Sequence, residues 1–400
     1  SAHGAVGHDP PVGEMGELSS KNTSIGAGVA MIPGGDVFIF GGAKDYGEDG
    51  TDKILRMSQT DSADWDFDKI DTSTPNIDIS KNLAGLTATT TLVDGAPLIF
   101  VAGGRPDLGA TGENSSQAYL FDPATEEVVW GTGNSDKRLS EGRSNHQALL
   151  MEDGKVLLHG GFHSFGGVVP GATGTYDLFD PDKERFISGT TEAGEIGSAA
   201  ATLGQDGAMI CGGVERTPDS SIPVNGCTIV SLSGVTVNTD GLPDAVFGLA
   251  MASLGDGKIL ATGGVLNTVL DFEAADATDT AWLYNGNQWT RMTNTLTLAR
   301  ANHLMIPTPE GKIIIVGGTE TGGIIFPPEG PAVVCAELFD PATLSFEAIG
   351  GSCSNAGTGA KGAAAWWPGE GAFVLAGYDR APGASILGKT YGFIGFGPDL

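Results

Sequence analysis

HQALLMEDGKVLLHGG, residues 146–161, and TYDLFDPDKERFIS, residues 175–188, are the segments that decide the fold. Their apolar residues fall in short runs that include β-branched and aromatic side chains, and Gly, Asp or Pro bounds each run. Asp153-Gly154 supplies the positive φ of a tight hairpin turn, and Asp180-Pro181 favours a second turn. The pattern therefore predicts an antiparallel unit of four strands, at residues 146–151, 155–159, 175–179 and 184–187.

The same unit recurs along the chain. A Gly-Gly pair ends the second predicted strand of each copy, and successive pairs lie 51 to 62 residues apart. The pairs begin at Gly41, Gly103, Gly160, Gly212, Gly263 and Gly317, with a degenerate seventh at Ala376-Gly377. A sheet of about forty residues cannot bury both of its faces alone, so such units are stable when stacked on one another.

The repeat resembles the kelch repeat over nearly the whole chain. Its third-strand element is matched at Phe121-Asp122-Pro123, Phe179-Asp180-Pro181 and Phe339-Asp340-Pro341, and its Arg/His approach to the first strand at Arg143 to His146 and Arg300 to His303. The resemblance implies an all-β fold, a seven-bladed kelch-type β-propeller with four-stranded antiparallel blades. Activity is left open, because kelch propellers include protein-binding scaffolds, copper oxidases and sugar mutarotases.

We expect one propeller domain over residues 1–400. The blades are predicted at about 25–72, 84–132, 145–190, 196–240, 246–293, 300–350 and 360–400. The last unit lacks a fourth strand before the chain ends, whereas the leader at 1–24 has no hairpin of its own. Residues 12–19 are therefore predicted to supply the missing strand and to close the ring, which would cover an exposed sheet edge.

The charge balance limits the partners. With 49 acidic and 21 basic residues the net charge is −28, which disfavours nucleic acid and anionic membranes. No window approaches 18 apolar residues, so membrane insertion is not expected. We expect a monomeric propeller.

The four cysteines form two local pairs. The predicted strands place Cys211 beside Cys227 and Cys335 near Cys353, where disulfides can form. The alternative is four reduced, buried thiols in a cytosolic protein. Disulfides would indicate an extracellular, cell-surface or periplasmic protein.

The loops that follow Gly-Gly are long, at 43–53, 105–116, 162–174, 214–226, 265–279, 319–333 and 378–386, whereas the hairpin turns are short. Long loops are best explained by use, so we place the functional site on this long-loop face. The candidate binding residues are Arg105, Phe162, His163, Phe165, Glu215, Arg216, Phe326, Tyr378 and Arg380. Their aromatic members are expected either to anchor a partner or to cap the axial channel.

Metal chemistry has only scattered candidates. His146, His159 and His163 are candidate ligands for a transition metal, with structural hydrogen bonding as the alternative for the first two. The acidic segments 45–52 and 271–279 are candidate calcium loops, although neither has the spacing of an EF-hand. Kelch-type copper oxidases need a Tyr cross-linked to a Cys, and here each Cys has a predicted disulfide partner.

These observations favour a non-catalytic recognition module that binds a protein or glycan partner through the long-loop face. The alternative is a carbohydrate-active enzyme, mutarotase-like or oxidase-like, with its site at the axial mouth of the same face. Arg105, Glu215, Arg216 and Arg380 would line that mouth.

Overall fold

The computed structural model of this protein consists almost entirely of antiparallel β-strands. It describes residues 14–17, 26–33, 36–43, 50–59, 65–70, 83–106, 114–131, 137–162, 173–194, 196–216, 220–266, 269–270, 275–322, 336–349, 363–367, 371–375 and 392–395. Within these ranges the only helical element is a single 3₁₀ turn at Gly204–Asp206. No helix of the described ranges is long and apolar enough to cross a membrane.

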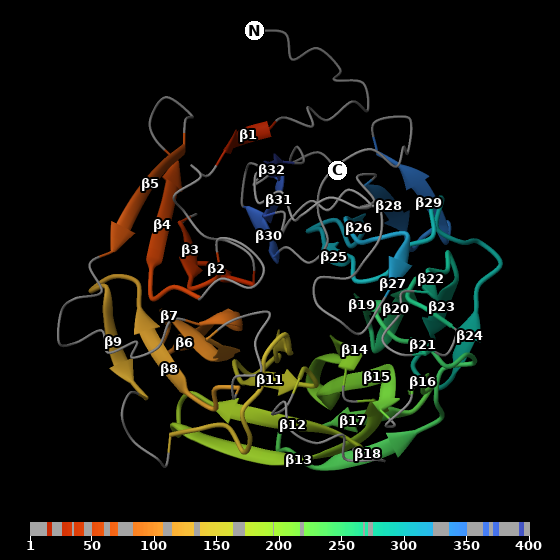
Figure 1. The fold of residues 1–400 in the computed structure, drawn as a ribbon. Coiled ribbons are helices and arrows are strands. Elements are labelled where there is room, and N and C mark those ends of the chain that lie inside the picture. The colour runs from red at the N-terminus through yellow and green to blue at the C-terminus, as the bar shows by residue number, and fades with distance from the viewer. Residues whose placement is uncertain are drawn as a thin grey trace, which may run out of the picture.

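The strands form seven sheets arranged around an axis, as the β-propeller prediction requires (Figure 1). Blades one to three are β2 (Gly28–Met31), β3 (Val37–Phe40), β4 (Ile54–Gln59) and β5 (Trp65–Ile70); β6 (Ala84–Val93), β7 (Ala96–Arg105), β8 (Ala118–Asp122) and β9 (Glu127–Trp130); and β10 (Gln147–Leu150), β11 (Val156–His159), β12 (Thr173–Asp180) and β13 (Arg185–Gly194). Blades four to six are β14 (Ile196–Thr202), β15 (Ala208–Arg216), β17 (Cys227–Val230) and β18 (Thr236–Thr239); β19 (Ala250–Gly255), β20 (Lys258–Thr262), β23 (Ala281–Tyr284) and β24 (Trp289–Arg291); and β25 (Leu304–Pro307), β26 (Ile313–Val316), β28 (Glu337–Asp340) and β29 (Ser345–Ala348).

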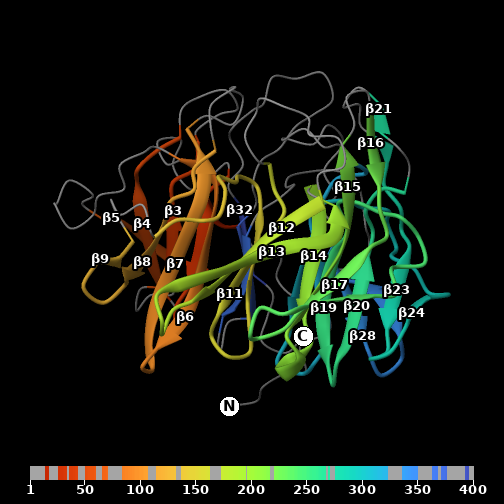
Figure 2. The same cartoon turned by 90° about the horizontal axis from the view of Figure 1, so that it is seen from below.

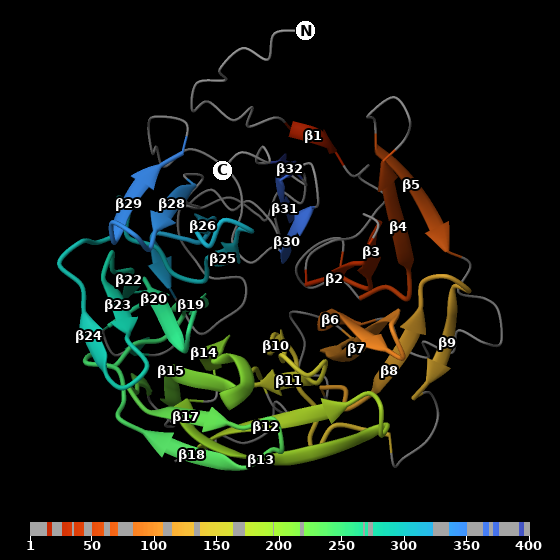
Figure 3. The ribbon, with the colours of Figure 1, turned by 180° about the vertical axis from the view of Figure 1, so that it is seen from behind.

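The seventh sheet joins the two ends of the chain. It contains β30 (Ala363–Trp367), β31 (Gly371–Leu375) and β32 (Gly392–Gly395), and its fourth strand is β1 (Glu14–Glu17). Glu14 is paired with Ile394 and Glu17 with Gly392, so the segment predicted at residues 12–19 does complete this sheet. The inner strand β30 contacts both β25 and β2, the inner strands of blades six and one (Figure 3).

The Gly-Gly pairs are the points where neighbouring blades join. In the six described pairs both glycines have positive φ, between 61° and 96°, a conformation that costs other residues about 1 kcal/mol or more. The second glycine donates its N–H to the next blade: Gly104 to the Arg143 carbonyl and Gly264 to the Arg300 carbonyl, both at 2.8 Å. A side chain here would be strained and would also hold the two blades apart.

A second set of backbone hydrogen bonds surrounds the axis just before the inner strands. Gly85 N–H donates to the Gly26 carbonyl at 2.6 Å, and Asn145 N–H donates to the Gly85 carbonyl at 2.7 Å. The pattern repeats from Gly248 to Gly197 and from Asn302 to Gly248, both at 2.7 Å. We call these six residues the axial belt: Gly26, Gly85, Asn145, Gly197, Gly248 and Asn302, all with positive φ.

The core lies between the blades. Phe100 of blade two stacks on Phe179 of blade three with ring centroids 4.3 Å apart, and Phe38 of blade one packs on Phe121 of blade two at 5.8 Å. The sheet of blade two thus has an apolar layer on both faces, which is why the alternating strands of one unit require neighbours on two sides.

Three of the long loops are paired with one another by short strands. β16 (Ser220–Pro223) extends the sheet of blade four and pairs with β21 (Val269–Leu270) of blade five. β22 (Ala275–Asp276) of blade five pairs with β27 (Thr321–Gly322) of blade six. In Figure 2, β16 and β21 stand at one face of the disc, beyond the ends of the neighbouring strands.

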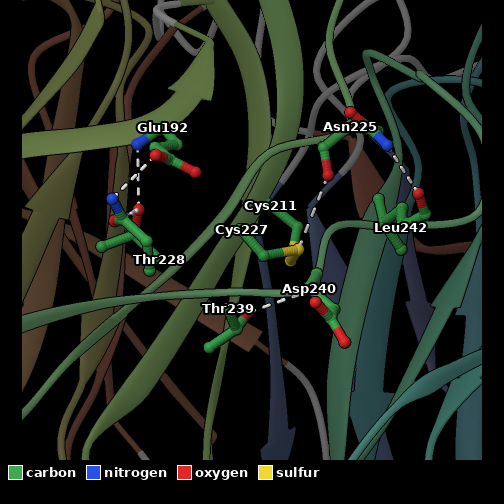
Figure 4. The surroundings of a disulfide bond; sticks show 9 residues. Glu192, Cys211, Asn225, Cys227, Thr228, Thr239, Asp240 and Leu242 are labelled. Atoms are coloured by element: carbon green, nitrogen blue, oxygen red, sulfur yellow. Dashed lines mark hydrogen bonds between the residues drawn. A yellow bond between two sulfur atoms is a disulfide. The ribbon is translucent and has the colours of Figure 1, made fainter.

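A disulfide lies at the base of the blade-four loop. Cys211 of β15 and Cys227 of β17 are directly opposite each other and are bonded, as predicted (Figure 4). The bond closes a segment with a sequence separation of 16, for which loop entropy predicts a contribution of about 3 kcal/mol. The predicted partners Cys335 and Cys353 lie outside the described residues.

The strand bounds were predicted well inside the blades and less well at their outer edges. The fourth strand of blade three was predicted at 184–187, but β13 continues to Gly194. Arg105 was assigned to a loop, but it is the last residue of β7, where it pairs with Ala84 of β6.

The Gly-Gly contact can be tested with two alanine substitutions at similar φ. Gly264 (φ 93°) would bring a Cβ atom to 2.6 Å from the Phe247 carbonyl oxygen, whereas Gly311 (φ 80°) has no atom within 4 Å. Both variants carry backbone strain, but only Gly264→Ala must move the neighbouring chain. We expect chemical denaturation to show that it loses about 2 kcal/mol more than Gly311→Ala. Equal losses would contradict the proposed joint.

The seventh sheet can be tested by truncation. Removing residues 1–17 deletes β1 and exposes the edge of β32, whereas removing residues 1–13 keeps β1. We expect the longer deletion to lower the free energy of unfolding by about 1–3 kcal/mol relative to the shorter one, the size of a few backbone hydrogen bonds. Identical denaturation curves for the two truncations would contradict a stabilising role for β1.

Candidate functional site

The candidate site is a cavity on the propeller axis, at the end where the inner strands begin. Its volume is about 530 Å³, within the range of small-molecule sites. Residues from β2, β6, β10, β14, β19 and β25 line it, together with all six residues of the axial belt. The axial belt, which follows directly on the Gly-Gly joints, forms one end of this cavity.

The described cavity lining is uncharged, and it mixes polar side chains with apolar ones such as Leu86. Thr87, Thr89, Gln147 and Ser198 contribute hydroxyl and amide groups, and no Asp, Glu, Lys or Arg is among the described residues that line it. In a protein of net charge −28, such a neutral cavity favours neutral ligands with many hydroxyl groups over ions.

Three histidines border the cavity, and each bonds to a hydroxyl on another blade. His146 Nε2 lies 2.8 Å from Thr87 Oγ1, His303 Nε2 lies 2.8 Å from Thr262 Oγ1, and His159 Nδ1 lies 3.2 Å from Ser198 Oγ. All three are at least 95 % buried, because their exposed fractions are 5 %, 5 % and 1 %. His146 thus links blades two and three, His303 links blades five and six, and His159 links blades three and four.

The motif Arg-x-Asn-His occurs in blades three and six, and its arginines form buried ion pairs. Arg143 Nη2 is 2.8 Å from Asp177 Oδ2, and Arg300 Nη2 is 2.7 Å from Glu337 Oε1, with all four side chains fully buried. Each guanidinium also donates from Nη1 to the first carbonyl of its own Gly-Gly pair, at 3.1 Å. These contacts fix the approach to the inner strand, and with it the asparagine and histidine that follow.

The predicted binding residues do not all converge on the cavity. Arg105 is 4 % exposed, and Phe162 is 9 % exposed within an apolar cluster that includes Ala84 and Ile196. Glu215 is exposed on β15, and Arg216 ends that strand. None of these four residues lines the cavity described above. The other five predicted binding residues lie outside the described residues: His163, Phe165, Phe326, Tyr378 and Arg380. Of the candidate calcium loops, residues 271–274 and most of 45–52 also lie outside them.

The residues that the sequence analysis missed are Asn145 and Asn302. Both belong to the axial belt and line the cavity. The sequence carries a signal for them, because the Arg-x-Asn-His motif places Asn where four other blades have Gly26, Gly85, Gly197 and Gly248. That correspondence is visible only after the units are aligned on the start of the inner strand rather than on Gly-Gly.

Comparisons with known proteins by sequence and by structure give different results. No family model matches the chain, and no curated protein matches it. Many solved structures are similar. One of them is a fungal alcohol oxidase of the AA5 family, solved in complex with copper. It is 15 % identical, with a TM-score of 0.63 over 94 % of this chain and 74 % of that chain. At this identity the similarity supports the propeller fold.

The comparison corrects the expected function. The sequence analysis favoured a non-catalytic recognition module, but the structural neighbour is an enzyme with the same propeller over nearly the whole of this chain. That finding contradicts the preference for a binding module. It favours the enzyme that the sequence analysis kept as its alternative.

The buried histidines predict a pH dependence of stability. Burial and the nearby Arg143 guanidinium lower the pKa of His159 from 6.5 to about 3. Burial and Arg300 likewise lower the pKa of His303 well below 6.5. His159 is therefore neutral in the folded protein at pH 5, and His303 stays neutral well below its ordinary pKa, whereas the unfolded chain binds protons below about pH 6.5. The free energy of unfolding should therefore fall as the pH decreases from 6.5, by up to about 1.4 kcal/mol per pH unit for each histidine.

Urea denaturation between pH 7 and pH 4 measures this slope. We expect His159→Gln and His303→Gln each to make it shallower. Ser198→Ala is the matched control, because it removes the hydrogen bond to His159 without removing a titrating group. It should lower stability at every pH and leave the slope unchanged. A slope that is the same in the parent and in both histidine variants would contradict the assignment.

Proposed function

We propose that this protein is a carbohydrate-active enzyme, mutarotase-like or oxidase-like, that binds a small neutral substrate in the axial cavity. The observation that carries the proposal is the cavity itself, which is about 530 Å³ in volume and whose described lining is uncharged and combines apolar side chains with hydroxyl and amide groups. Such groups both donate to and accept from substrate hydroxyls. The similar fold of an alcohol oxidase supports an enzyme that acts on substrates of this class.

The neighbouring structure contains copper, and a copper site in this chain would need suitable ligands close together. The described residues contain no group of three or more His, Cys, Asp or Glu side chains that could hold a metal ion. His146, His159 and His303 face three different blade junctions rather than one another. The described part of the chain therefore does not fit copper, and the candidate ligand His163 lies outside it.

The tyrosine and cysteine residues lead to the same conclusion. Cys211 and Cys227 are bonded to each other, so neither is available for a bond to tyrosine. Tyr176 donates its hydroxyl to the Gly234 carbonyl at 2.8 Å, and Tyr284 packs on Trp289 with ring centroids 5.3 Å apart. Neither tyrosine lines the cavity. These two tyrosines thus hold structural positions.

We further propose that the chain is a kelch-type propeller that works outside the cytoplasm. The repeated Gly-Gly pairs and third-strand elements support the kelch assignment, and the described disulfide supports an oxidising compartment. An extracellular, cell-surface or periplasmic location would also give the enzyme access to free sugars and alcohols.

The function can be tested by incubating the purified protein with and without Cu(II) and measuring oxygen uptake and hydrogen peroxide. The substrates are a panel of primary alcohols and neutral sugars, and polarimetry on the same sugars detects anomerisation. We expect oxidation or anomerisation of neutral substrates and little activity on an anionic sugar acid, since no Lys or Arg is among the described residues that line the cavity. The absence of both oxidation and anomerisation in both preparations would contradict an enzyme of this class.

The location of the site can be tested by filling the cavity. Gln147 is an exposed residue of the cavity lining, so Gln147→Trp should occupy the space without disturbing the core. We expect this variant to lose turnover at normal stability. Val129→Trp is the control, because Val129 is 51 % exposed on β9, away from the axis. Equal turnover in both variants would place the site elsewhere.

A further inference from the structure

The axial belt is built from two residue types, and only one of them contributes a side chain to the cavity. Glycine occupies four of its described positions, and asparagine occupies the positions of blades three and six. The backbone conformation is the same at all six, with φ between 50° and 72°. The belt hydrogen bonds also have the same form, since Asn145 and Asn302 donate as Gly85 and Gly248 do.

The fold does not use the two amides. Asn145 and Asn302 line the cavity and are partly exposed, and neither side chain has a hydrogen bond to a described residue. A positive φ is also less favourable for asparagine than for glycine. The belt would therefore form at least as well with glycine, as it does in the other blades.

The geometry points to Asn145 and Asn302 as ligand-binding residues that hold hydroxyl groups of a neutral sugar from two sides of the cavity. Each amide offers two donors and an acceptor, which matches a pair of neighbouring hydroxyls. Blades three and six are separated by blades four and five, so the amides approach from different sides and would fix the orientation of a ligand between them. Gln147 follows Asn145 by two residues and adds a third amide to the cavity lining.

This inference rests on the proposed function for the position of the site, and it adds the residues that select the ligand. The arginine of each motif secures the backbone beside the asparagine: Arg143 through Asp177 and Arg300 through Glu337. The amides are thus attached to a rigid part of the belt. Rigid attachment favours binding because little side-chain freedom is lost when the ligand arrives.

The experiment replaces each asparagine with the residue that the other blades carry. Asn145→Gly, Asn302→Gly and the double variant should retain the melting temperature of the parent, because the belt backbone is unchanged. Binding of galactose, glucose and a neutral disaccharide is measured by saturation-transfer NMR and titration calorimetry, with glucuronate as the anionic probe. We expect each single variant to bind the preferred neutral sugar about five-fold more weakly, the effect of one lost hydrogen bond, and the double variant to bind it more weakly still.

The matched control is Asp256→Gly, because Asp256 also has a φ of 50° but lies in the hairpin turn between β19 and β20. Its affinity should equal that of the parent. Parent affinity in the double asparagine variant, no neutral sugar bound by the parent, or glucuronate bound as well as glucose would each overturn the inference.

Turnover separates this inference from the proposed function. If the parent binds sugar through the asparagines but converts no substrate, the enzyme proposal fails and the inference stands. If the parent converts substrate and the double variant does so with the same KM, the inference fails and the enzyme proposal stands.

Discussion

The hydrogen bonds between one blade and the next are the constraint on which the rest of the structure depends. The second glycine of a Gly-Gly pair reaches the following blade, and the axial belt repeats that contact nearer the axis. Both contacts need a left-handed backbone and a close approach, which glycine permits. Aromatic layers such as Phe100 on Phe179 then fill the space between the blades that these bonds have set. The cavity is the space enclosed by the belt and the inner strands.

The repeat allowed the fold to be predicted because it combines two local signals with one global requirement. Turn residues and alternating apolar residues define each sheet, and a sheet that cannot bury both faces must stack. The same reasoning placed β1 against β32 and Cys211 against Cys227. It failed for Arg105 and for the end of β13, because strand pairing continues past Gly-Gly and past the blade edge in ways that only tertiary contacts determine.

The candidate site was harder to predict because its residues are not the ones that sequence reasoning favours. Charged loop residues such as Glu215 draw attention, yet the described cavity has no charge. His146 and His159 have a residue type that suggests metal binding, but each is used to join blades. Asn145 is inconspicuous in the sequence, since it follows a buried arginine and precedes a structural histidine. Its place on the axis emerges only when the blades are arranged in a circle.

The strand pairs between loops have a consequence for the evolution of this propeller. The loop of blade five pairs with blade four through β21 and with blade six through β22, so the loops of three successive repeats are joined by hydrogen bonds. An insertion in any of these loops shifts a register that its neighbour must match. Blades four to six are therefore expected to change together, as a single inherited block, whereas a repeat whose loop is unpaired is free to diverge alone.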